Sequence, residues 1–167
     1  MSVPESHRAA AGAVSLACAV LTASDTRREE NDHSGRLMCD LLREAGHEIA
    51  RYAVVREDPD NLRAALEEAS NAADVILLNG GTGVSPRDRT VEVVQDFVER
   101  DLPGFGELFR MMSYQDIGSA AMLSRAVAGV RGKTVVFATP GSTAAVRLAM
   151  TRLIVPELRH LSKLLRG

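Results

Sequence analysis

Short, mainly apolar runs alternate along the chain with segments whose apolar residues repeat at helical spacing. The runs cover Val14 to Thr22, Ile49 to Val55, Asp74 to Asn79 and Lys133 to Thr139. Continuous apolar runs are typical of strands covered on both faces, and the spacing of the intervening segments is typical of helices that pack against a sheet. The alternation therefore predicts an α/β fold, with one doubly wound, mostly parallel sheet and helices on both of its faces.

The helices are predicted around residues 37–45, 62–69, 91–98, 105–112 and 145–165. Gly46 follows the first of them in the position of a C-terminal cap, and Asp58-Pro59 precedes the second as cap and first residue. A length of 167 residues is that of one domain. We expect residues 1–12 to form a flexible tail and residues 13–167 to form the domain.

Charge and composition exclude several classes of partner. The net charge of −2 argues against a general nucleic-acid binder, which would carry a basic excess. No run reaches the roughly 18 apolar residues of a membrane span. Val14 to Ala23 passes directly into polar residues without a cleavage site, so we interpret it as a buried strand and expect a cytoplasmic protein. The cysteines and histidines have no metal-ligand spacing.

Small and acidic residues follow the predicted strands at the edge where an open α/β sheet binds ligands. They are Thr22 to Asp25, Glu57-Asp58, Gly80 to Asp88 and Pro140 to Ser142. Because the carboxyl ends of parallel strands meet at one edge, these segments are predicted to come together.

The segment GGTGVSPRDRT, Gly80 to Thr90, carries the most specific pattern. Glycines let the backbone approach a phosphate closely and expose N–H donors. Arg87 offers a cation for phosphate oxygens, and Asp88 offers a carboxylate for Mg²⁺. The alternative is a tight turn in which Asp88 or Thr90 caps the next helix. Asp58 and Ser142 likewise have a second interpretation, because each is also a good helix N-cap.

Standard nucleotide loops are absent from the sequence. The string Gly129 to Thr134 ends like a P-loop, but Val127 replaces its first glycine and the segment enters a strand instead of leaving one. No G-x-S-x-G nucleophile motif occurs either. Neither standard loop would therefore bind ATP in this chain.

The chain resembles the MoaB/MogA family of molybdenum cofactor biosynthesis from about Ala13 to Leu165. The resemblance rests on the segments TASD (22–25), GGTGVSPRDRT (80–90), PGFGELFR (103–110), IGS (117–119), LSRAVAGV (123–130) and PGS (140–142). The stretch from PGFGELFRMMS to SRAVAGV is similar to the MoaB branch.

The resemblance implies a molybdopterin-binding α/β domain with a small antiparallel addition, expected here from about Ser124 to Lys133. It implies a homotrimer or homohexamer. It also implies an adenylyltransferase that uses Mg²⁺ to transfer AMP from ATP to the terminal phosphate of molybdopterin, with release of pyrophosphate. The adenylyl-molybdopterin would pass to a separate molybdenum-insertase protein, and no nucleic acid or membrane is involved.

The same resemblance assigns roles to individual residues. Asp88 matches the family's Mg²⁺-binding aspartate, and the second acid falls on Asp58 or Glu57, with Asp58 preferred. The residues expected to bind nucleotide phosphates are Gly80, Gly81, Thr82, Gly83 and Arg87. Those expected to hold the pterin and its phosphate are Ser24, Asp25, Ser119, Gly141 and Ser142.

Two other functions are compatible with parts of the sequence. The first is a catalytically silent, oligomeric molybdopterin-binding or scaffold protein of the same pathway. Members of the MoaB type that look inactive lack the arginine before the aspartate, whereas this chain keeps Arg87-Asp88, which favours activity. The second is a flavodoxin-like flavin binder, which the absence of tryptophan and the presence of only Tyr52 and Tyr114 disfavour.

Overall fold

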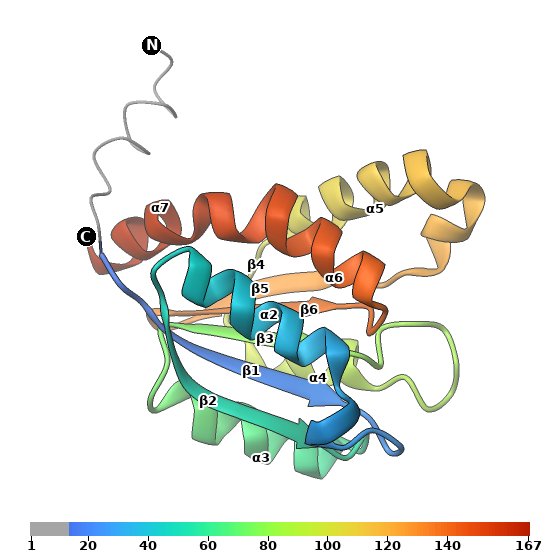
Figure 1. The fold of residues 1–167 in the computed structure, drawn as a ribbon, viewed down its shortest axis with the longest axis horizontal. Helices are drawn as coiled ribbons and strands as arrows, with labels where there is room; N and C mark the ends of the chain where they lie inside the picture. Colours follow the sequence, from blue (N-terminus) through green and yellow to red (C-terminus); the bar gives the residue numbers. More distant parts are fainter. Residues whose placement is uncertain (1–13) are drawn as a thin grey trace.

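The computed structural model describes residues 14–167, and the predicted tail, residues 1–12, lies outside this range. Six strands form one sheet in the order β2-β1-β3-β6-β5-β4 (Figure 1). Their bounds are β1 Ala17–Ala23, β2 Glu48–Val55, β3 Val75–Asn79, β4 Arg100–Asp101, β5 Val127–Arg131 and β6 Thr134–Thr139. The first four strands in the spatial order, β2, β1, β3 and β6, are parallel to one another.

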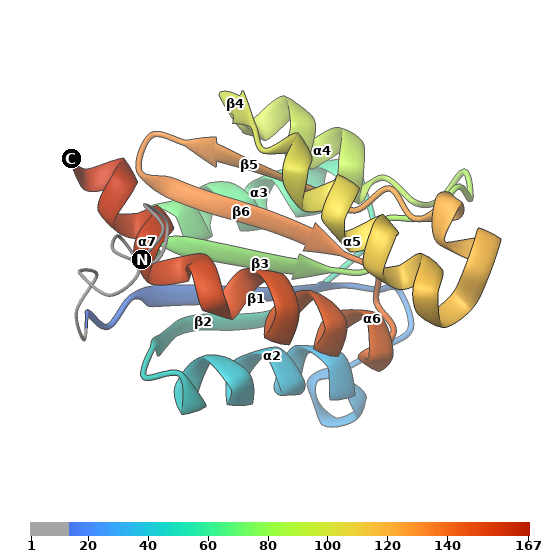
Figure 2. The same ribbon diagram turned by 90° about the horizontal axis from the view of Figure 1, so that it is seen from above.

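The helices lie on both faces of this sheet (Figures 1 and 2). They are α2 His33–Glu44, α3 Pro59–Ser70, α4 Thr90–Phe97, α5 Pro103–Ile117, α6 Thr143–Ala149 and α7 Val155–Arg166. Short turns of other helix types cover Glu29–Asn31 (η1), Gly118–Leu123 (η2) and Met150–Ile154 (η3). The predicted helical segments are confirmed, and η3 joins α6 to α7 without a loop.

The core is divided by the sheet into two layers, because successive side chains of a strand point to opposite faces. In β3, Val75 and Leu77 pack with α2, α5, α6 and α7, whereas Ile76 and Leu78 pack with α3 and α4. All the residues of β3 are buried. The continuous apolar run thus has the physical cause expected from the sequence, which is helix cover on both sides.

The predicted antiparallel addition is also confirmed. β5 turns at Gly132 into β6 and pairs with it antiparallel, and the short strand β4 pairs antiparallel with the outer edge of β5. Within residues 14–167, no helix has both the length and the apolar composition that crossing a membrane would require.

Candidate functional site

The glycine-rich segment leaves β3 at the carboxyl edge of the sheet, where it touches two neighbouring strand ends. Gly80 has a φ of +96°, and a Cβ atom there would lie 2.3 Å from the carbonyl oxygen of Ala23 at the end of β1. A Cβ on Gly141, which follows β6, would lie 3.2 Å from the Cα of Gly80. Only glycine fits the conformation and the spacing at Gly80. The ends of β1, β3 and β6 are therefore held in direct backbone contact.

Carboxylates from three loops gather over Gly81 and Gly83. A Cβ on Gly81 would lie 2.4 Å from both Glu57 Oε1 and Thr90 Oγ1, and a Cβ on Gly83 would lie 2.7 Å from Asp88 Oδ2. The Glu57 amide donates a 3.1 Å hydrogen bond to Asp25 Oδ1, which ties the end of β2 to the loop after β1. The glycines leave the room that these oxygens occupy.

Two of these oxygens are buried and unsatisfied. Glu57 Oε1 and Thr90 Oγ1 find no hydrogen-bond partner among residues 14–167. Burial raises the pKa of the Glu57 carboxyl, and the negative charges of Asp88 and Asp25 raise it further, while Arg87 lowers it. Buried polar atoms are normally paired, so this arrangement is what a site for a cation or a hydrogen-bonding ligand would show.

The donor set has the character of a site for a hard cation. In the part of the chain that the structure describes, no cluster of three or more carboxylate, histidine or cysteine side chains could hold a metal ion alone. Mg²⁺, however, commonly takes one or two carboxylates and completes its shell with water and substrate phosphates. Glu57 and Asp88 meet that requirement.

The loop that carries Asp88 is fastened from outside the sequence motif. Arg125, between η2 and β5, donates from Nε to the Gly83 carbonyl at 2.7 Å and from Nη2 to the Asp88 carbonyl at 2.8 Å. Its backbone amide donates to the Thr82 carbonyl at 2.9 Å. The Asp88 carboxylate in turn accepts a 2.8 Å hydrogen bond from the Ser85 amide.

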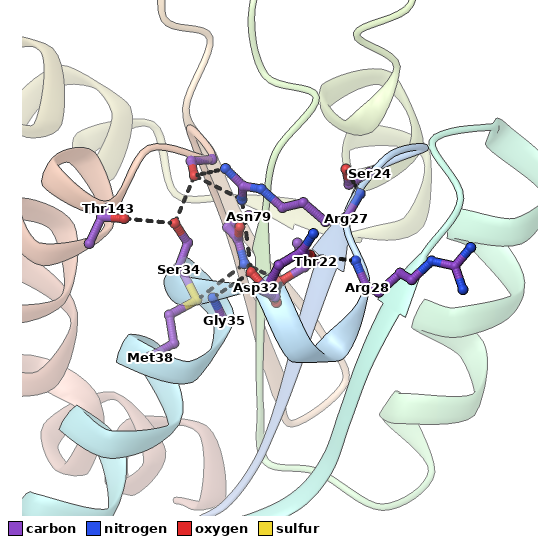
Figure 3. Close-up of polar contacts among 12 residues, drawn as sticks. Thr22, Ser24, Arg27, Arg28, Asp32, Ser34, Gly35, Met38, Asn79 and Thr143 are labelled. Atoms are coloured by element: carbon purple, nitrogen blue, oxygen red, sulfur yellow. Dashed lines mark hydrogen bonds and ion pairs between the residues drawn. The ribbon is translucent and has the colours of Figure 1, made fainter.

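A buried polar network supports the neighbouring edge, around the loop after β1 (Figure 3). Asp32 is completely buried and caps α2 by accepting from the Gly35 amide at 3.0 Å. Its other oxygen accepts from the Thr22 hydroxyl at 2.6 Å and from the Tyr52 hydroxyl at 2.8 Å. Asn79 Nδ2 donates to Thr22 Oγ1 at 2.7 Å, which links β3 to the same network.

Two side chains extend this network to the turn after β6. Both terminal nitrogens of Arg27 donate to the Gly141 carbonyl at 3.1 Å, and Arg27 Nη1 lies 3.8 Å from Asp32 Oδ1. The Ser34 hydroxyl donates to the same carbonyl at 2.8 Å (Figure 3). The turn 140–142 is thus fixed by groups from the loop after β1 and from α2.

A cavity of about 230 Å³ opens beside the glycine-rich loop. Its walls come from the loop (Thr82, Gly83), from α5 and η2, and from the turn after β6; the lining is mainly apolar and includes Phe109, Ile117 and Leu123. Its polar groups include Ser113, Ser124 and Ser142. A flat organic ring with a polar edge would suit such a lining.

Comparison with known proteins identifies the family to which the chain belongs. Residues 19–160 match the family model described as a probable molybdopterin binding domain. The chain is 50% identical, over 99% of its length and 98% of the relative's, to molybdenum cofactor biosynthesis protein B of Bacillus subtilis strain 168. The chain belongs to the MoaB/MogA family.

Solved structures of this family have the same fold. A crystal structure of a molybdenum cofactor biosynthesis protein B matches the structure of this chain with a TM-score of 0.90 and 48% identity, covering 93% of this chain and 98% of the other. The tungsten cofactor synthesizing protein MoaB from Pyrococcus furiosus matches with a TM-score of 0.83 and 37% identity, covering 92% and 98%.

The structure brings most of the predicted site residues of this MoaB/MogA protein to one edge. Gly80, Gly81, Gly83 and Asp88 lie together, and Thr82 is buried beneath them. Arg87 lies on the exposed tip of the same loop. The alternative that Asp88 or Thr90 caps α4 is not observed, since the N-cap of α4 is Arg89 and makes no side-chain capping bond among the described residues.

Of the two adjacent acids, the structure places Glu57, and not the preferred Asp58, beside Gly81 and Asp88. Asp58 caps α3: Oδ1 accepts from the Asn61 amide at 3.0 Å, and Oδ2 accepts from the Asn61 side chain. Glu57 is the neighbour whose carboxyl meets Asp88. The sequence left both residues open because consecutive residues at a strand end point to opposite sides, and neither the length of β2 nor its last turn could be fixed from it.

The residues predicted to hold the pterin differ in whether they line the cavity. The Ser24 hydroxyl accepts from the Arg27 amide at 3.0 Å and orders the loop after β1, where Asp25 also lies. Ser142 lines the cavity and also caps α6 by accepting from the Ala145 amide at 3.2 Å. Ser119 is exposed on η2, and the η2 residues that line the cavity are Ala121 and Leu123.

Three polar residues of the site were missed by sequence reasoning. Arg27 and Arg125 hold carbonyls of the site loops through long-range contacts. Asp32 accepts from the hydroxyls of Thr22 and Tyr52. Asp32 had one usable signal, because Asp32-His33-Ser34-Gly35 precedes an apolar helical stripe and fits an N-cap. Arg125 lies inside the family-like string 123–130, but nothing in that string indicates contact with residues 83–88.

Proposed function

We propose that this protein is a molybdopterin adenylyltransferase that uses Mg²⁺ and ATP. The observation that carries the proposal is the group formed by Glu57 and Thr90 over Gly81 and by Asp88 over Gly83. Two buried oxygens of this group, Glu57 Oε1 and Thr90 Oγ1, lack a hydrogen bond within residues 14–167. Membership of a family described as molybdopterin-binding supplies the organic substrate. The presence of Arg87 directly before Asp88 in the glycine-rich loop supports the active form over the silent one.

Mg²⁺ would be held by the carboxylates of Glu57 and Asp88, with phosphate oxygens of ATP among its other ligands. When bound, it would neutralise charge on the phosphates and so favour transfer at the α-phosphorus. Binding would also offset the repulsion between these two carboxylates, which contributes to the raised pKa of Glu57. Thr90 Oγ1 would gain a partner in the water or phosphate of the filled site.

The chain's own groups would position two anions and need no covalent nucleophile. A terminal phosphate oxygen of molybdopterin bonds to the α-phosphorus of ATP while the bond to the β-phosphate oxygen breaks, and pyrophosphate leaves. Backbone amides of residues 80–83 and the Arg87 guanidinium would hold the phosphates of ATP and stabilise charge during transfer. The 230 Å³ cavity beside the loop would hold the pterin, with Ser142 near its mouth.

The test is anaerobic incubation of the protein with molybdopterin, ATP and Mg²⁺, followed by detection of AMP-linked pterin and pyrophosphate. We expect product from the parent, and a loss of at least ~100-fold in Asp88→Asn and Glu57→Gln, on the scale of removing a group that stabilises a transition state. Asp58→Asn, one residue away, is the matched control and should retain activity. Molybdopterin binding without any product would instead support the silent scaffold protein.

We also propose that the product passes directly to a molybdenum-insertase protein. Adenylyl-molybdopterin carries a phosphoanhydride exposed to water once it leaves the cavity, so transfer within a complex would protect it. A purified insertase added to the reaction should raise the yield of intact product, whereas an unrelated protein of similar charge should not.

A further inference from the structure

Asp88 lies at the end of a loop that has no regular secondary structure. The tip, from Val84 to Arg87, is exposed, and Figure 1 shows this connection from β3 to α4 projecting beyond the sheet edge. A loop of this kind would sample many conformations unless its backbone were fastened. The proposed chemistry needs the opposite, because a metal ligand must be held within a fraction of an ångström.

The side chain of Arg125 fastens this loop. Nε and Nη2 of Arg125 reach the carbonyls of Gly83 and Asp88 at 2.7 and 2.8 Å, which are the two ends of the projecting part of the loop. Glu92 on α4 completes the arrangement by accepting from Arg125 Nη1 at 2.5 Å. The guanidinium therefore joins the loop to α4 and to the segment that leads into β5, three parts of the fold that are separate in sequence.

Arginine is the side chain that can do this. Its planar fork presents N–H donors in fixed directions, so both carbonyls and the Glu92 carboxylate can be bonded at once. A lysine has three N–H donors on one nitrogen, so it lacks the separate, fixed donor positions by which Nε, Nη1 and Nη2 of Arg125 reach their three partners. The carbonyl that Arg125 holds at Asp88 belongs to the residue whose carboxylate faces Glu57, so the direction of that carboxylate depends on the contact.

We propose that Arg125 is a positioning residue of the site. It closes the loop 83–88 and aims Asp88 at the Mg²⁺ position without contacting substrate. The inference rests on the proposed function for its catalytic consequence, but the closure of the loop is a property of the protein alone. The two parts can therefore be measured separately.

The first measurement is hydrogen exchange of the ligand-free protein across residues 81–90. The reporting amides are those of Ser85, Asp88 and Thr90, which donate to Asp88 Oδ2, to the Ser85 carbonyl and to the Gly81 carbonyl. We expect Arg125→Gln to exchange at least ~10-fold faster there, Arg125→Lys to be intermediate, and Glu92→Gln to stay close to the parent because both carbonyl bonds remain.

The matched control is Arg131→Gln. Arg131 is an arginine of similar side-chain exposure, 36% against 32% for Arg125, and it also pairs with one glutamate, Glu67. It lies on β5, away from the loop. Its removal should leave the exchange of residues 81–90 unchanged. Protection of the loop that is equal in Arg125→Gln and in the parent would overturn the proposal.

The second measurement is the Mg²⁺ dependence of AMP transfer. If Arg125 positions Asp88, Arg125→Gln should raise the Mg²⁺ concentration for half-maximal rate by about 10-fold or more while KM for molybdopterin stays within twofold, and Arg125→Lys should recover part of the loss. Equal losses in Mg²⁺ and pterin dependence would show general damage and contradict a positioning role. A parent without transferase activity would refute the proposed function, and the exchange data would still decide the loop closure.

Discussion

At the scale of single residues, the site depends on which of two adjacent acids faces the glycine-rich loop. Glu57 and Asp58 have the same charge and the same place at the end of β2, so the sequence could narrow the second acid to this pair and no further. The decision is made by Asn61, one turn into α3, whose amide and side chain both bond the Asp58 carboxylate. Asp58 is thereby committed to its helix, and these bonds lower the pKa of its carboxyl.

Asp58→Ala should therefore act on stability and leave binding intact. Loss of the N-cap is expected to lower the urea concentration at the midpoint of unfolding. Titration calorimetry with ATP and Mg²⁺ should give the parent affinity. A large loss of Mg²⁺-dependent affinity without loss of stability would restore Asp58 as the second metal-binding acid.

Glu57→Gln should have the opposite effects. The folded-state pKa of Glu57 is raised above its ordinary value of 4.5, so the fold favours its protonated form, and its stabilising contribution is lost as the pH rises through the folded-state pKa. At pH 7.5 without Mg²⁺ the variant should melt roughly 1–3 °C above the parent, a small change because the side chain is partly exposed.

The difference in melting temperature should shrink as the pH falls towards 4.5, where the parent Glu57 is itself protonated. Glu107→Gln, on the exposed surface of α5, is the control and should show no such trend. The stabilised variant should at the same time lose Mg²⁺-dependent nucleotide binding. A variant that is destabilised at neutral pH would mean that the Glu57 carboxylate is satisfied in the folded protein.

At the scale of elements, the four parallel strands and the helices followed from the sequence pattern, whereas β4, β5 and the connections did not. β3 and β6 were predicted to within one residue, because an apolar run flanked by polar residues has clear ends. The loop between β1 and α2 gave no such pattern. Its order comes from Asp32, which is buried by Thr22, Tyr52 and Arg27 from other positions in the chain, and partners of that kind cannot be found from local spacing.

Tyr52→Phe tests how much this network contributes to the junction of β1, β2 and α2. The hydroxyl donates to the buried Asp32 carboxylate, and burial and this hydrogen bond raise the pKa of Tyr52 above its usual value. Removing it should lower the free energy of unfolding by about 1.5–3 kcal/mol, the range for a hydrogen bond to a charged group. Denaturant unfolding of the variant and of the parent measures this difference, and equal free energies of unfolding would show that the network is not stabilising.

At the scale of the whole molecule, the predicted parallel sheet with helices on both faces is confirmed, because it depends on patterns that repeat over many residues. The antiparallel addition is confirmed too, but it was expected from the family resemblance alone. The division of the core into two layers could be predicted from these patterns without knowledge of individual contacts. How copies of the chain associate depends on the surface, and a trimer or hexamer was expected only from the family resemblance. The structure adds one relevant surface: large apolar side chains are 45–75% exposed along α5 and η2, namely Leu108, Met111, Tyr114, Ile117, Met122 and Leu123.

We propose that this apolar face of α5 and η2 is buried between subunits of the expected trimer or hexamer, since contiguous exposed apolar patches on a monomer are rare. The double variant Leu108→Glu/Met111→Glu would place two charges in the contact and remove side chains whose burial each contributes about 1.5–3 kcal/mol. Light scattering after gel filtration should then report monomers, in contrast to the trimers or hexamers expected of the parent.

The control is Leu164→Glu, which alters an apolar residue that is 60% exposed on α7. This helix lies at the far end of the molecule from η2 in Figures 1 and 2, so the variant should leave the assembly intact. An unchanged mass for the double variant would place the subunit contact elsewhere. Because η2 also lines the cavity beside the glycine-rich loop, we expect dissociation to weaken molybdopterin binding as well, and the two effects should appear together in the same variant.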